Sequence, residues 1–515
     1  MTLLYNHKKH MESLSPEQQY AFDKFKQKEN LFITGPGGTG KTKLVKHLVD
    51  QAILEGKHHA VCAMTGCAAI LLNCKARTLH SWSGIKLAKG EKKDIVASVL
   101  RNKTATKTWR QVDILIVDEV SMLSKKVFEI IEEIARASRL SSLPFGGIQV
   151  IFTGDFYQLP PVGSENEKDT DLFCFESSLW STVFKMENHI QLKTMFRQTD
   201  PRYIRLLHQV RTGTLDSENT ALLHSHVKRE YKAELHHGSI PTKLYPLRSQ
   251  TDYLNTTMFL KLPEKEHVYE VIRKTDCKSY LESGKPFTKD ILDKCSRLGV
   301  KDIEYELQGL VLNSPCTHTL RLKRGAAVMC IVNLDMENRI CNGSQGVVLD
   351  ILENGTPIVK FANGIIKHIS VHYWQSEDYP TVAIGQYPIT LAWAMTIHKI
   401  QGATLSLAEM NLGQSIFEYG QTYVALSRIQ SLDGLYLSEF HPGRIKAHPK
   451  VNVFYKKIED NEKIRPRLTT TPVPPLPSLP SLHTDASGVF EKFRYTDGVS
   501  PTIEIKDSNI KTIRL

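Results

Sequence analysis

Apolar runs alternate with amphipathic stretches over the first third of the chain. Apolar strands are expected at 31–34, 59–65, 112–118 and 148–153, with segments of helical periodicity between them. This alternation predicts a parallel sheet with helices on both faces, because each helix returns the chain to the same edge of the sheet. We therefore expect an α/β domain over residues 1–185.

A second α/β domain is expected in two pieces, residues 186–260 and 385–445. The stretch between them, 261–384, changes to short strands punctuated by Asn-Gly pairs at 342–343, 354–355 and 363–364. Asn-Gly between apolar runs is a strong hairpin signal, because both residues tolerate a positive φ. The insertion is therefore predicted to hold a small all-β module.

The C-terminal segment, residues 446–515, contains the run RPRLTTTPVPPLPSLPSLHTDASG. Proline at this density can neither continue a helix nor pair into a sheet. We expect an extended, mostly disordered tail that acts as a tether. Docking of the tail into a proline-binding groove of a protein partner is the alternative.

The composition, with 41% hydrophobic and 23% charged residues, is that of a globular protein. No run of about 18 uncharged apolar residues occurs, so no membrane partner is expected. The first residues, MTLLYNHKKHMESLSPEQQ, resemble neither a secretion signal nor a mitochondrial presequence. We expect a soluble intracellular protein, with nuclear, mitochondrial, bacterial and viral settings all open.

The charge balance points to a polyanionic partner. Lysine and arginine exceed aspartate and glutamate by 11, and such a net charge attracts phosphate backbones. The nine cysteines are scattered, and the closest pair, Cys62 and Cys67, has the wrong spacing for a zinc ribbon or a CxxC redox motif. Most of them are expected to be small buried residues.

The stretch LFITGPGGTGKTKLVKHL contains a phosphate-binding pattern between a strand and an amphipathic helix. In the pattern GxxxxGK[ST], glycines let backbone N–H groups surround the phosphates of a nucleoside triphosphate. Lys41 is expected to reach the β- and γ-phosphates, and the Thr42 hydroxyl to bind Mg²⁺. The predicted nucleotide loop comprises Gly35, Pro36, Gly37, Gly38, Thr39, Gly40, Lys41 and Thr42.

Two later strands end in polar residues that complete such a site. In VDILIVDEVSML, the apolar strand ends at Asp118, which can hold Mg²⁺ through water. The next residue, Glu119, can polarise the attacking water. A protein that only binds nucleotide needs the first acid, whereas hydrolysis requires a general base. Gln158, in GGIQVIFTGDFYQLPPV, follows the third strand and is expected near the γ-phosphate.

Several longer motifs follow one another along the chain. The first is EVSMLSKKVFEIIEEIARASR at 119–139, followed by PFGGIQVIFTGDFYQLPPV, and the later ones are FRQ at 196–198, LAWAMTIHKIQGATL at 391–405 and YVALSRIQ at 423–430. The first pair resembles the signature of the PIF-type (petite integration frequency) ATP-dependent DNA helicases, and the later motifs resemble the remaining motifs of that family in the same order. These helicases belong to superfamily 1B, which also contains the RecD and phage Dda helicases. The resemblance covers about residues 13–440.

The resemblance implies two RecA-like P-loop motor domains, with an SH3-like module in the insertion at 261–384. It also implies a wedge that separates duplex DNA, at residues 76–108. This wedge insertion is rich in lysine, at Lys86, Lys89, Lys92, Lys93, Lys103 and Lys107.

The resemblance also implies roles for single residues at the nucleotide. Gln18 resembles the glutamine that reads the adenine edge. Arg197 and Arg428 resemble two arginines that reach the γ-phosphate from the second motor domain, where they would stabilise the charge of the transition state. The expected catalytic residues are Lys41, Glu119, Gln158, Arg197 and Arg428.

Two further motif pairs resemble those that contact single-stranded DNA. MTGCAAILL and TLHSWSGI give Thr65, Gly66 and His80 in the first domain, and Trp82 either stacks on a base or packs under a loop. The segment TIHKIQG supplies the second domain. Its expected DNA contacts are Thr396, His398 and Lys399, and Gln401 and Gly402 of the same segment are assigned to the nucleotide.

Taken as a family member, the chain is expected to be an ATP- and Mg²⁺-dependent helicase. It would move 5′ to 3′ on single-stranded DNA as a monomer and open forked or structured duplexes in replication, repair or recombination. Two alternatives stay open: a recombination motor of the RecD or Dda branch, and an ATP-regulated single-strand-binding translocase that does not unwind. A small-molecule kinase would leave the second motor domain unexplained.

Overall fold

The computed structural model describes residues 14–464, apart from positions 73, 75, 165, 232–240, 282–283, 315, 336 and 377–378. The proline-rich run predicted to form a tail begins at residue 465 and lies outside the described residues. The unit that ends at Ile464 is described by itself below.

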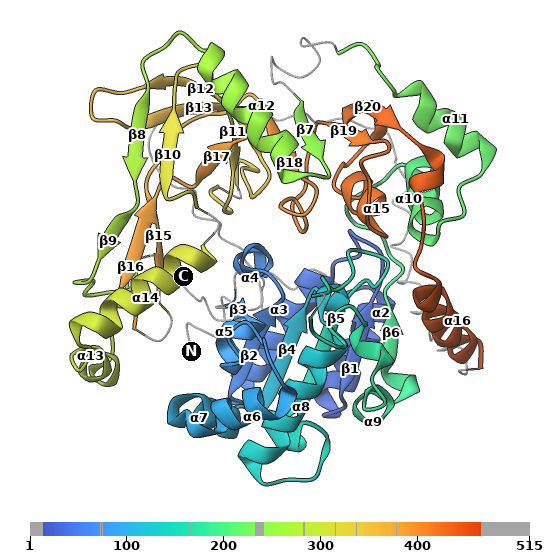
Figure 1. Cartoon of the computed structure of the whole chain (residues 1–515), viewed down its shortest axis with the longest axis vertical. Helices are drawn as coiled ribbons and strands as arrows, with labels where there is room; N and C mark the ends of the chain where they lie inside the picture. Colours follow the sequence, from blue (N-terminus) through green and yellow to red (C-terminus); the bar gives the residue numbers. More distant parts are fainter. Residues whose placement is uncertain are drawn as a thin grey trace, which may run out of the picture. The chain divides into compact units, whose positions relative to one another are not determined.

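A six-stranded parallel sheet follows the strands predicted in the first third of the chain (Figure 1). Its order is β3-β2-β4-β5-β1-β6, and every neighbouring pair runs parallel. The last strand follows residue 185, so the first sheet extends beyond the predicted domain boundary. The strands are β1 (Leu31–Thr34), β2 (His59–Ala63), β3 (Arg77–Thr78), β4 (Ile114–Asp118), β5 (Gln149–Gly154) and β6 (His189–Gln191).

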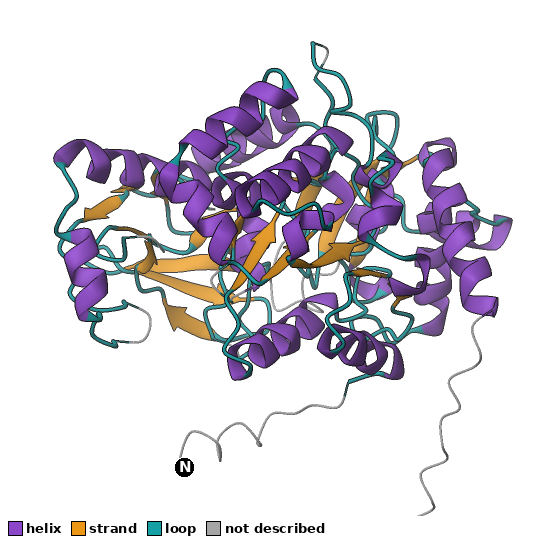
Figure 2. Ribbon diagram, turned by 90° about the horizontal axis from the view of Figure 1, so that it is seen from below, coloured by secondary structure: helices purple, strands orange, loops and turns teal. Residues whose placement is uncertain are grey.

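Helices cover both faces of this sheet, as Figure 2 shows for the strands and the helices around them. Successive residues of a strand point to opposite faces. Ile33 packs with α2, α3 and α4, whereas Phe32 lies in the apolar cluster on the other face, which includes the apolar side of α8. The helices are α2 (Pro16–Lys26), α3 (Lys41–Leu54), α4 (Gly66–Leu72), α8 (Lys125–Arg139) and α9 (Trp180–Val183).

The lysine-rich insertion is helical and packs on α8. It comprises α5 (Leu79–Ser83), α6 (Lys92–Arg101) and α7 (Lys103–Gln111). Trp82 is buried and meets Trp109 edge to face at 4.5 Å, and the Trp109 indole donates a hydrogen bond to Ser83 O at 3.1 Å. Of the two interpretations of Trp82, the structure therefore bears out packing.

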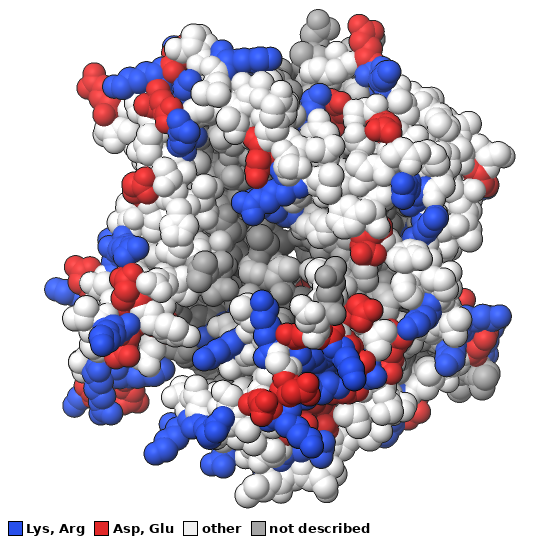
Figure 3. Space-filling model, in the orientation of Figure 1, with Lys and Arg blue, Asp and Glu red and all other residues white. Residues whose placement is uncertain are grey.

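Ion pairs and a hydrogen bond hold this insertion against α8 and the loop that follows β5. Lys92 pairs with Glu129 and, at 3.4 Å, with Asp169. The Lys126 ammonium pairs with Glu167 and donates to Gly90 O at 2.7 Å. Basic and acidic side chains lie side by side in the lower centre of Figure 3. The other five lysines of the insertion, Lys86, Lys89, Lys93, Lys103 and Lys107, are exposed.

A second parallel sheet, of order β18-β7-β19-β20, draws strands from both pieces of the chain that the sequence assigns to the second domain. Its strands are β7 (Thr242–Tyr245), β18 (Ala394–Thr396), β19 (Ala408–Leu412) and β20 (Leu435–Phe440). The accompanying helices are α10 (Pro201–Thr212), α11 (Ser217–Ser225), α12 (Arg248–Lys261) and α15 (Gln421–Leu426).

The insertion between these pieces contains the predicted antiparallel strands. A five-stranded sheet of order β14-β13-β12-β11-β17 turns at the Asn-Gly pairs 354–355 and 363–364. Two smaller antiparallel sheets, β10-β8 and β15-β16-β9, and two helices complete the insertion. The elements are β8 (His267–Glu270), β9 (Ile272–Lys274), α13 (Lys289–Cys295), α14 (Val300–Asn313), β10 (Thr319–Leu322), β11 (Ala327–Cys330), β12 (Gln345–Ile351), β13 (Pro357–Phe361), β14 (Ile366–His368), β15 (His372–Gln375), β16 (Ala383–Gln386) and β17 (Ile389–Leu391).

A last helix, α16 (Pro449–Ile464), follows the second sheet but packs on the first α/β region. Phe454 stacks on Phe175 at 4.3 Å and meets Phe32 of β1 at 5.8 Å. The sequence did not predict this helix. Within the described ranges, no helix has both the length and the apolar character needed to cross a bilayer.

Candidate active site

The phosphate-binding pattern forms a loop between β1 and α3, as the sequence predicts. Gly38 and Gly40 have φ values of 99° and 76°, which side chains rarely allow. Space is limiting as well, because a Cβ on Gly38 would lie 2.8 Å from Arg197 Cβ and one on Gly40 would lie 2.7 Å from Gln18 Nε2. The loop leads into the N-terminus of α3, where free backbone N–H groups favour an anion.

Lys41, the first residue of α3, points back along the loop. Its ammonium donates to Gly35 O at 2.6 Å and to Pro36 O at 3.1 Å. Burial lowers the pKa of Lys41, and the carboxylates of Asp155, Glu119 and Asp118 oppose that effect. A phosphate would supply the negative charge that this buried ammonium favours.

Two carboxyl groups lie at the end of β4, the buried Asp118 and the half-buried Glu119. Asp118 accepts a hydrogen bond from the Thr153 hydroxyl, and burial raises the pKa of its carboxyl. Glu119 follows in a left-handed conformation with φ 55°. Burial, and then the neighbouring Asp118, raise the pKa of Glu119. The region therefore favours an added positive charge.

Asp118 and Thr42 fit the oxygen-ligand chemistry of Mg²⁺. A carboxylate and a hydroxyl are hard donors of the kind this ion takes, usually together with waters and phosphate oxygens. The burial that raises the pKa of Asp118 is a cost that a divalent cation would offset.

Gln401 of the second α/β region reaches both polar residues predicted to act on the γ-phosphate. Its Nε2 donates to Glu119 Oε2 at 3.2 Å and to Gln158 Oε1 at 3.3 Å. Glu119 directly follows β4, Gln158 lies in the loop after β5, and Gln401 lies in the turn after β18. The structure thus brings Glu119 and Gln158 together through one amide group.

Arg197 and Arg428 are the predicted arginines; beside the loop, Arg428 is buried and Arg197 is half-buried. Arg197 donates to Ser427 O at 3.0 Å, and Arg428 donates to Val424 O at 3.0 Å and to the Ser427 hydroxyl at 2.9 Å. Burial, and then Arg428, lower the pKa of Arg197 to about 9, and burial lowers the pKa of Arg428. Neither guanidinium has a carboxylate within ion-pair distance among the described residues. Two such cations favour an anion between them.

Most of these residues line one cavity of about 360 Å³, although Asp118 and Gln401 lie outside its lining. Phe196, Thr404 and Gln430 also line it, and the sequence did not assign them a role. Phe196 is 48% exposed, which is unusual for a phenylalanine and offers a ring face at the site. Its position next to Arg197 in FRQ was the available signal. The full lining is Gly37, Gly38, Gly40, Lys41, Thr42, Glu119, Gln158, Phe196, Arg197, Gly402, Thr404, Arg428 and Gln430.

Gln18 is buried behind the loop instead of lining this cavity. Its Nε2 donates to Thr39 O at 3.2 Å and to Gly40 O at 3.3 Å, and its Oε1 accepts from Ser15 N at 3.0 Å. Both ends of the amide therefore bind the protein backbone here. Its contact with adenine stays a prediction.

The predicted DNA contacts of the first region follow the carboxyl ends of β2 and β3, and none lines the cavity. Thr65 Oγ1 accepts a hydrogen bond from Ala68 N at 3.2 Å and so caps the N-terminus of α4, whose first residue is Gly66. His80 is half-buried in α5, and burial lowers its pKa. Their contacts with DNA stay predictions.

The corresponding residues of the second region follow β18. Thr396 Oγ1 accepts from Lys399 N at 3.3 Å, and the Lys399 side chain is exposed. The His398 ring lies parallel to Phe417, with centroids 6.2 Å apart. Gln401, two residues later, is the residue that contacts Glu119 and Gln158.

The chain matches the family model described as PIF1-like helicase over residues 13–221, and the model of the DNA helicase Pif1 2B domain over residues 307–351. It is 32% identical over 458 residues to the ATP-dependent DNA helicase Pif1 of Bdellovibrio bacteriovorus, covering 87% of this chain and 93% of that protein. The chain belongs to the PIF1-like helicase family. This confirms the resemblance to the PIF-type helicases.

Two further relatives of this PIF1-like chain bear on size and fold. It is 34% identical over 451 residues to the ATP-dependent DNA helicase PIF1 of Danio rerio, covering 87% of this chain and 64% of that protein. The chain thus spans slightly less than two thirds of that relative. A crystal structure of Pif1 helicase from Bacteroides with ADP-AlF3 and single-stranded DNA shares 26% identity and a TM-score of 0.57, covering 87% and 98% of the two chains. The predicted fold class is confirmed.

Proposed function

We propose that the chain is an ATP-dependent DNA helicase that moves 5′ to 3′ on single-stranded DNA. One observation carries the proposal. Lys41, Glu119, Arg197 and Arg428 line a single cavity, and the two arginines come from the chain beyond the first sheet. A site that only bound nucleotide would have no need of a general base and two guanidinium groups lining the same cavity.

In the proposed reaction, Glu119 accepts a proton from a water molecule, which attacks the γ-phosphorus. The bond to the β–γ bridging oxygen breaks, and ADP and phosphate leave. Lys41, Arg197 and Arg428 stabilise the negative charge of the transferred group. Mg²⁺, held at Asp118 and Thr42, would neutralise charge on the phosphate oxygens. Gln401 and Gln158 position the groups that face the γ-phosphate.

Nucleotide binding beyond the phosphates rests on the surroundings of the loop. The half-exposed ring of Phe196 is available for a base to stack on. Gln18, which holds the loop backbone, is the predicted reader of adenine. The Bacteroides relative was crystallised with ADP-AlF3, which supports ATP as the nucleotide used here.

DNA is the proposed substrate, and the Bacteroides relative was crystallised with single-stranded DNA. Thr65, Gly66 and His80, with Thr396, His398 and Lys399, would follow the sugar-phosphate chain, because hydroxyl, imidazole and ammonium groups bind it without reading base identity. The exposed lysines of the insertion at 76–108 would face the duplex as it opens. Polarity is carried over from the family resemblance.

We also propose that the motor acts as a monomer. A single chain supplies both the phosphate loop and the two arginines that face it. No second copy is needed to complete the cavity.

The test is strand separation on two matched duplexes, one with a 5′ single-stranded tail and one with a 3′ tail, with ATP and Mg²⁺. Opening of only the 5′-tailed duplex is expected, and Lys41→Ala should open neither. Opening of only the 3′-tailed duplex would contradict the polarity. If neither duplex opens while DNA still stimulates hydrolysis, the chain is a translocase that does not unwind alone.

A further inference from the structure

A buried carboxylate outside the cavity connects four elements. Asp155, directly after β5, is fully buried and accepts five hydrogen bonds. Two come from Arg211 of α10, each at 2.9 Å, and one from its own loop, Tyr157 N, at 3.2 Å. The hydroxyls of Tyr423 in α15 and Tyr455 in α16 each donate at 3.1 Å. Burial would raise the pKa of Asp155, but Arg211 holds it below its usual value.

Tyr423 links this carboxylate to the phosphate loop. Its hydroxyl donates to Asp155 and accepts the backbone N–H of Gly37 at 2.9 Å. A single hydroxyl therefore joins the loop, the end of β5 and α15. The next turn of the chain after Tyr423 carries Arg428, whose guanidinium lines the cavity.

Tyr455 links the same carboxylate to the strand that precedes the loop. Its hydroxyl lies 2.5 Å from Thr34 Oγ1 and accepts Phe156 N at 3.1 Å. Thr34 is the last residue of β1, next to Gly35. Because the Tyr455 proton goes to Asp155, the threonine hydroxyl is the donor in the remaining pair. The Tyr455 ring stacks on Tyr157 at 4.7 Å, and the Arg211 guanidinium lies 4.9 Å from the Tyr455 ring centroid.

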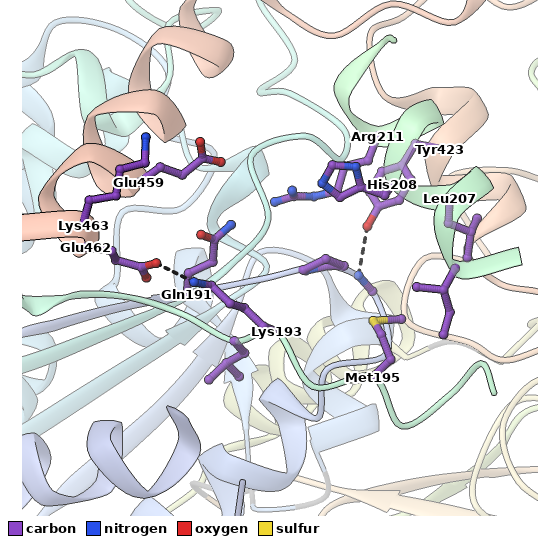
Figure 4. Close-up of a pocket in the computed structure, with 14 residues that line it drawn as sticks. Gln191, Lys193, Met195, Leu207, His208, Arg211, Tyr423, Glu459, Glu462 and Lys463 are labelled. Carbon is purple, nitrogen blue, oxygen red and sulfur yellow. Dashed lines mark hydrogen bonds and ion pairs between the residues drawn. The ribbon is translucent and has the colours of Figure 1, made fainter. Parts of the chain in front are cut away.

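Beside this group lies a second cavity of about 520 Å³, which Figure 4 shows. Glu459, Glu462 and Lys463 of α16 lie on one side, opposite the side formed by α10 and α15. The Lys193–Glu462 ion pair, at 2.7 Å, ties α16 to the chain after β6. The helix thus holds the first region at two points and leaves open space next to α10.

We propose that Tyr455 is a positioning residue of the ATPase, and that α16 is the strap that delivers it. By holding Thr34 and Asp155 together, the Tyr455 hydroxyl keeps the phosphate loop in register with α10 and α15, from which Arg211 and Tyr423 reach the same carboxylate. The inference rests on the proposed ATP hydrolysis. Tyr455 does not line the nucleotide cavity, so its effect must pass through these neighbours.

Removal of this one hydroxyl should affect turnover more than nucleotide affinity. The cavity lining stays intact in Tyr455→Phe, so KM for ATP should stay within about twofold of wild type. The arginines act mainly on the transition state, and their alignment with the loop depends on the hydrogen bonds at Asp155. We therefore expect kcat of DNA-stimulated hydrolysis to fall about fivefold to tenfold, the size of a lost hydrogen bond to a charged group.

Phe454→Leu is the matched control. This neighbouring side chain packs in the aromatic cluster of α16 and has no polar contact with the group around Asp155. This substitution should lower the melting temperature. In assays run about 20 °C below that melting temperature, KM and kcat should stay within about twofold of wild type. Steady-state hydrolysis is measured with saturating single-stranded DNA, alongside thermal unfolding of each variant.

The result distinguishes this inference from the proposed function. If Tyr455→Phe loses stability but keeps its kcat, as Phe454→Leu should, the helix is only structural and the inference is wrong. If Lys41→Ala hydrolyses ATP like wild type, the proposed function fails independently. A large rise in KM for Tyr455→Phe with unchanged kcat would also overturn the positioning role.

Discussion

Glu119 adopts a strained backbone conformation at its position in the site. A left-handed backbone costs a residue with a Cβ about 1–2 kcal/mol, and Glu119 has φ 55° where it lines the cavity. Such strain persists only where the surroundings enforce it, and it clusters at functional sites. The amide of Gln401 holds the carboxylate in this conformation.

Glu119→Gln tests the assignment of the general base. The amide is isosteric and can still bind Gln401, but it cannot accept a proton from water. We expect ATP binding close to wild type and hydrolysis slower by about 10²–10⁴-fold, the usual contribution of a general base. Fluorescent-nucleotide titration and DNA-stimulated turnover measure the two quantities, and unchanged turnover would place the base elsewhere.

Asp155 allows a prediction about stability. Asp155→Asn leaves Arg211 buried without a countercharge, so the free energy of unfolding should fall by about 3–5 kcal/mol at pH 7. The exposed Asp252→Asn, which breaks a surface pair with Arg248, should change it by less than about 1 kcal/mol. Urea unfolding followed by tryptophan fluorescence measures both variants.

The pH dependence of this loss follows from the lowered pKa of Asp155. A carboxyl with a depressed folded pKa stabilises above its unfolded pKa of about 3.9 and loses that contribution as pH falls through the folded value. The difference between wild type and Asp155→Asn should therefore be constant from pH 7 to about 5 and shrink below about 4. A difference that grows toward acid pH would contradict the direction of the shift.

Among the elements, the lysine-rich insertion shows how charge can serve anchoring instead of binding. Lys92 of α6 pairs with Glu129 of α8 and with Asp169 of the loop after β5, and Lys126 of α8 pairs with Glu167 of that loop, so these contacts hold α6 and the loop on α8. The remaining lysines of the insertion are exposed. The proposed wedge would have to resist displacement when it separates strands, and these contacts provide that resistance.

Lys126→Met tests this anchoring. The side chain is 5% exposed and bonds Gly90 O as well as Glu167, so its loss should loosen the insertion without touching the cavity. We expect unwinding of a 5′-tailed duplex to slow severalfold while hydrolysis stimulated by single-stranded DNA stays within about twofold. The exposed Lys301→Met serves as control, and equal unwinding by both variants would exclude an anchoring role.

The same scale shows what the sequence could and could not predict. The strands at 31–34 and 114–118 and the loop between Gly35 and Thr42 carry local signals, namely apolar runs and a fixed glycine spacing. The helix α16 does not, because its decisive partners Thr34, Asp155 and Phe156 lie 299 to 421 residues earlier. Trp82 was undecided because its partner Trp109 comes from another helix.

At the scale of the whole molecule, the excess of 11 positive charges should appear in the salt dependence of DNA binding. The logarithm of the affinity for a single strand falls with the logarithm of salt concentration by about 0.7 for each phosphate neutralised. Lys399→Ala should reduce that slope by about 0.7. The slope is measured by the fluorescence anisotropy of a labelled oligonucleotide at salt concentrations from about 50 to 200 mM. Lys301→Ala is the control. An unchanged slope would remove Lys399 from the interface.

Gln401 lies close to both the proposed hydrolytic site and the predicted DNA contacts. Its amide touches Glu119 and Gln158, and Lys399, a predicted DNA contact, is two residues away on the same short turn. Single-stranded DNA that displaced this turn would change the position of Glu119, the proposed general base, without any long-range rearrangement. Hydrolysis of ATP would then depend on bound single-stranded DNA, and the protein without DNA would consume little ATP.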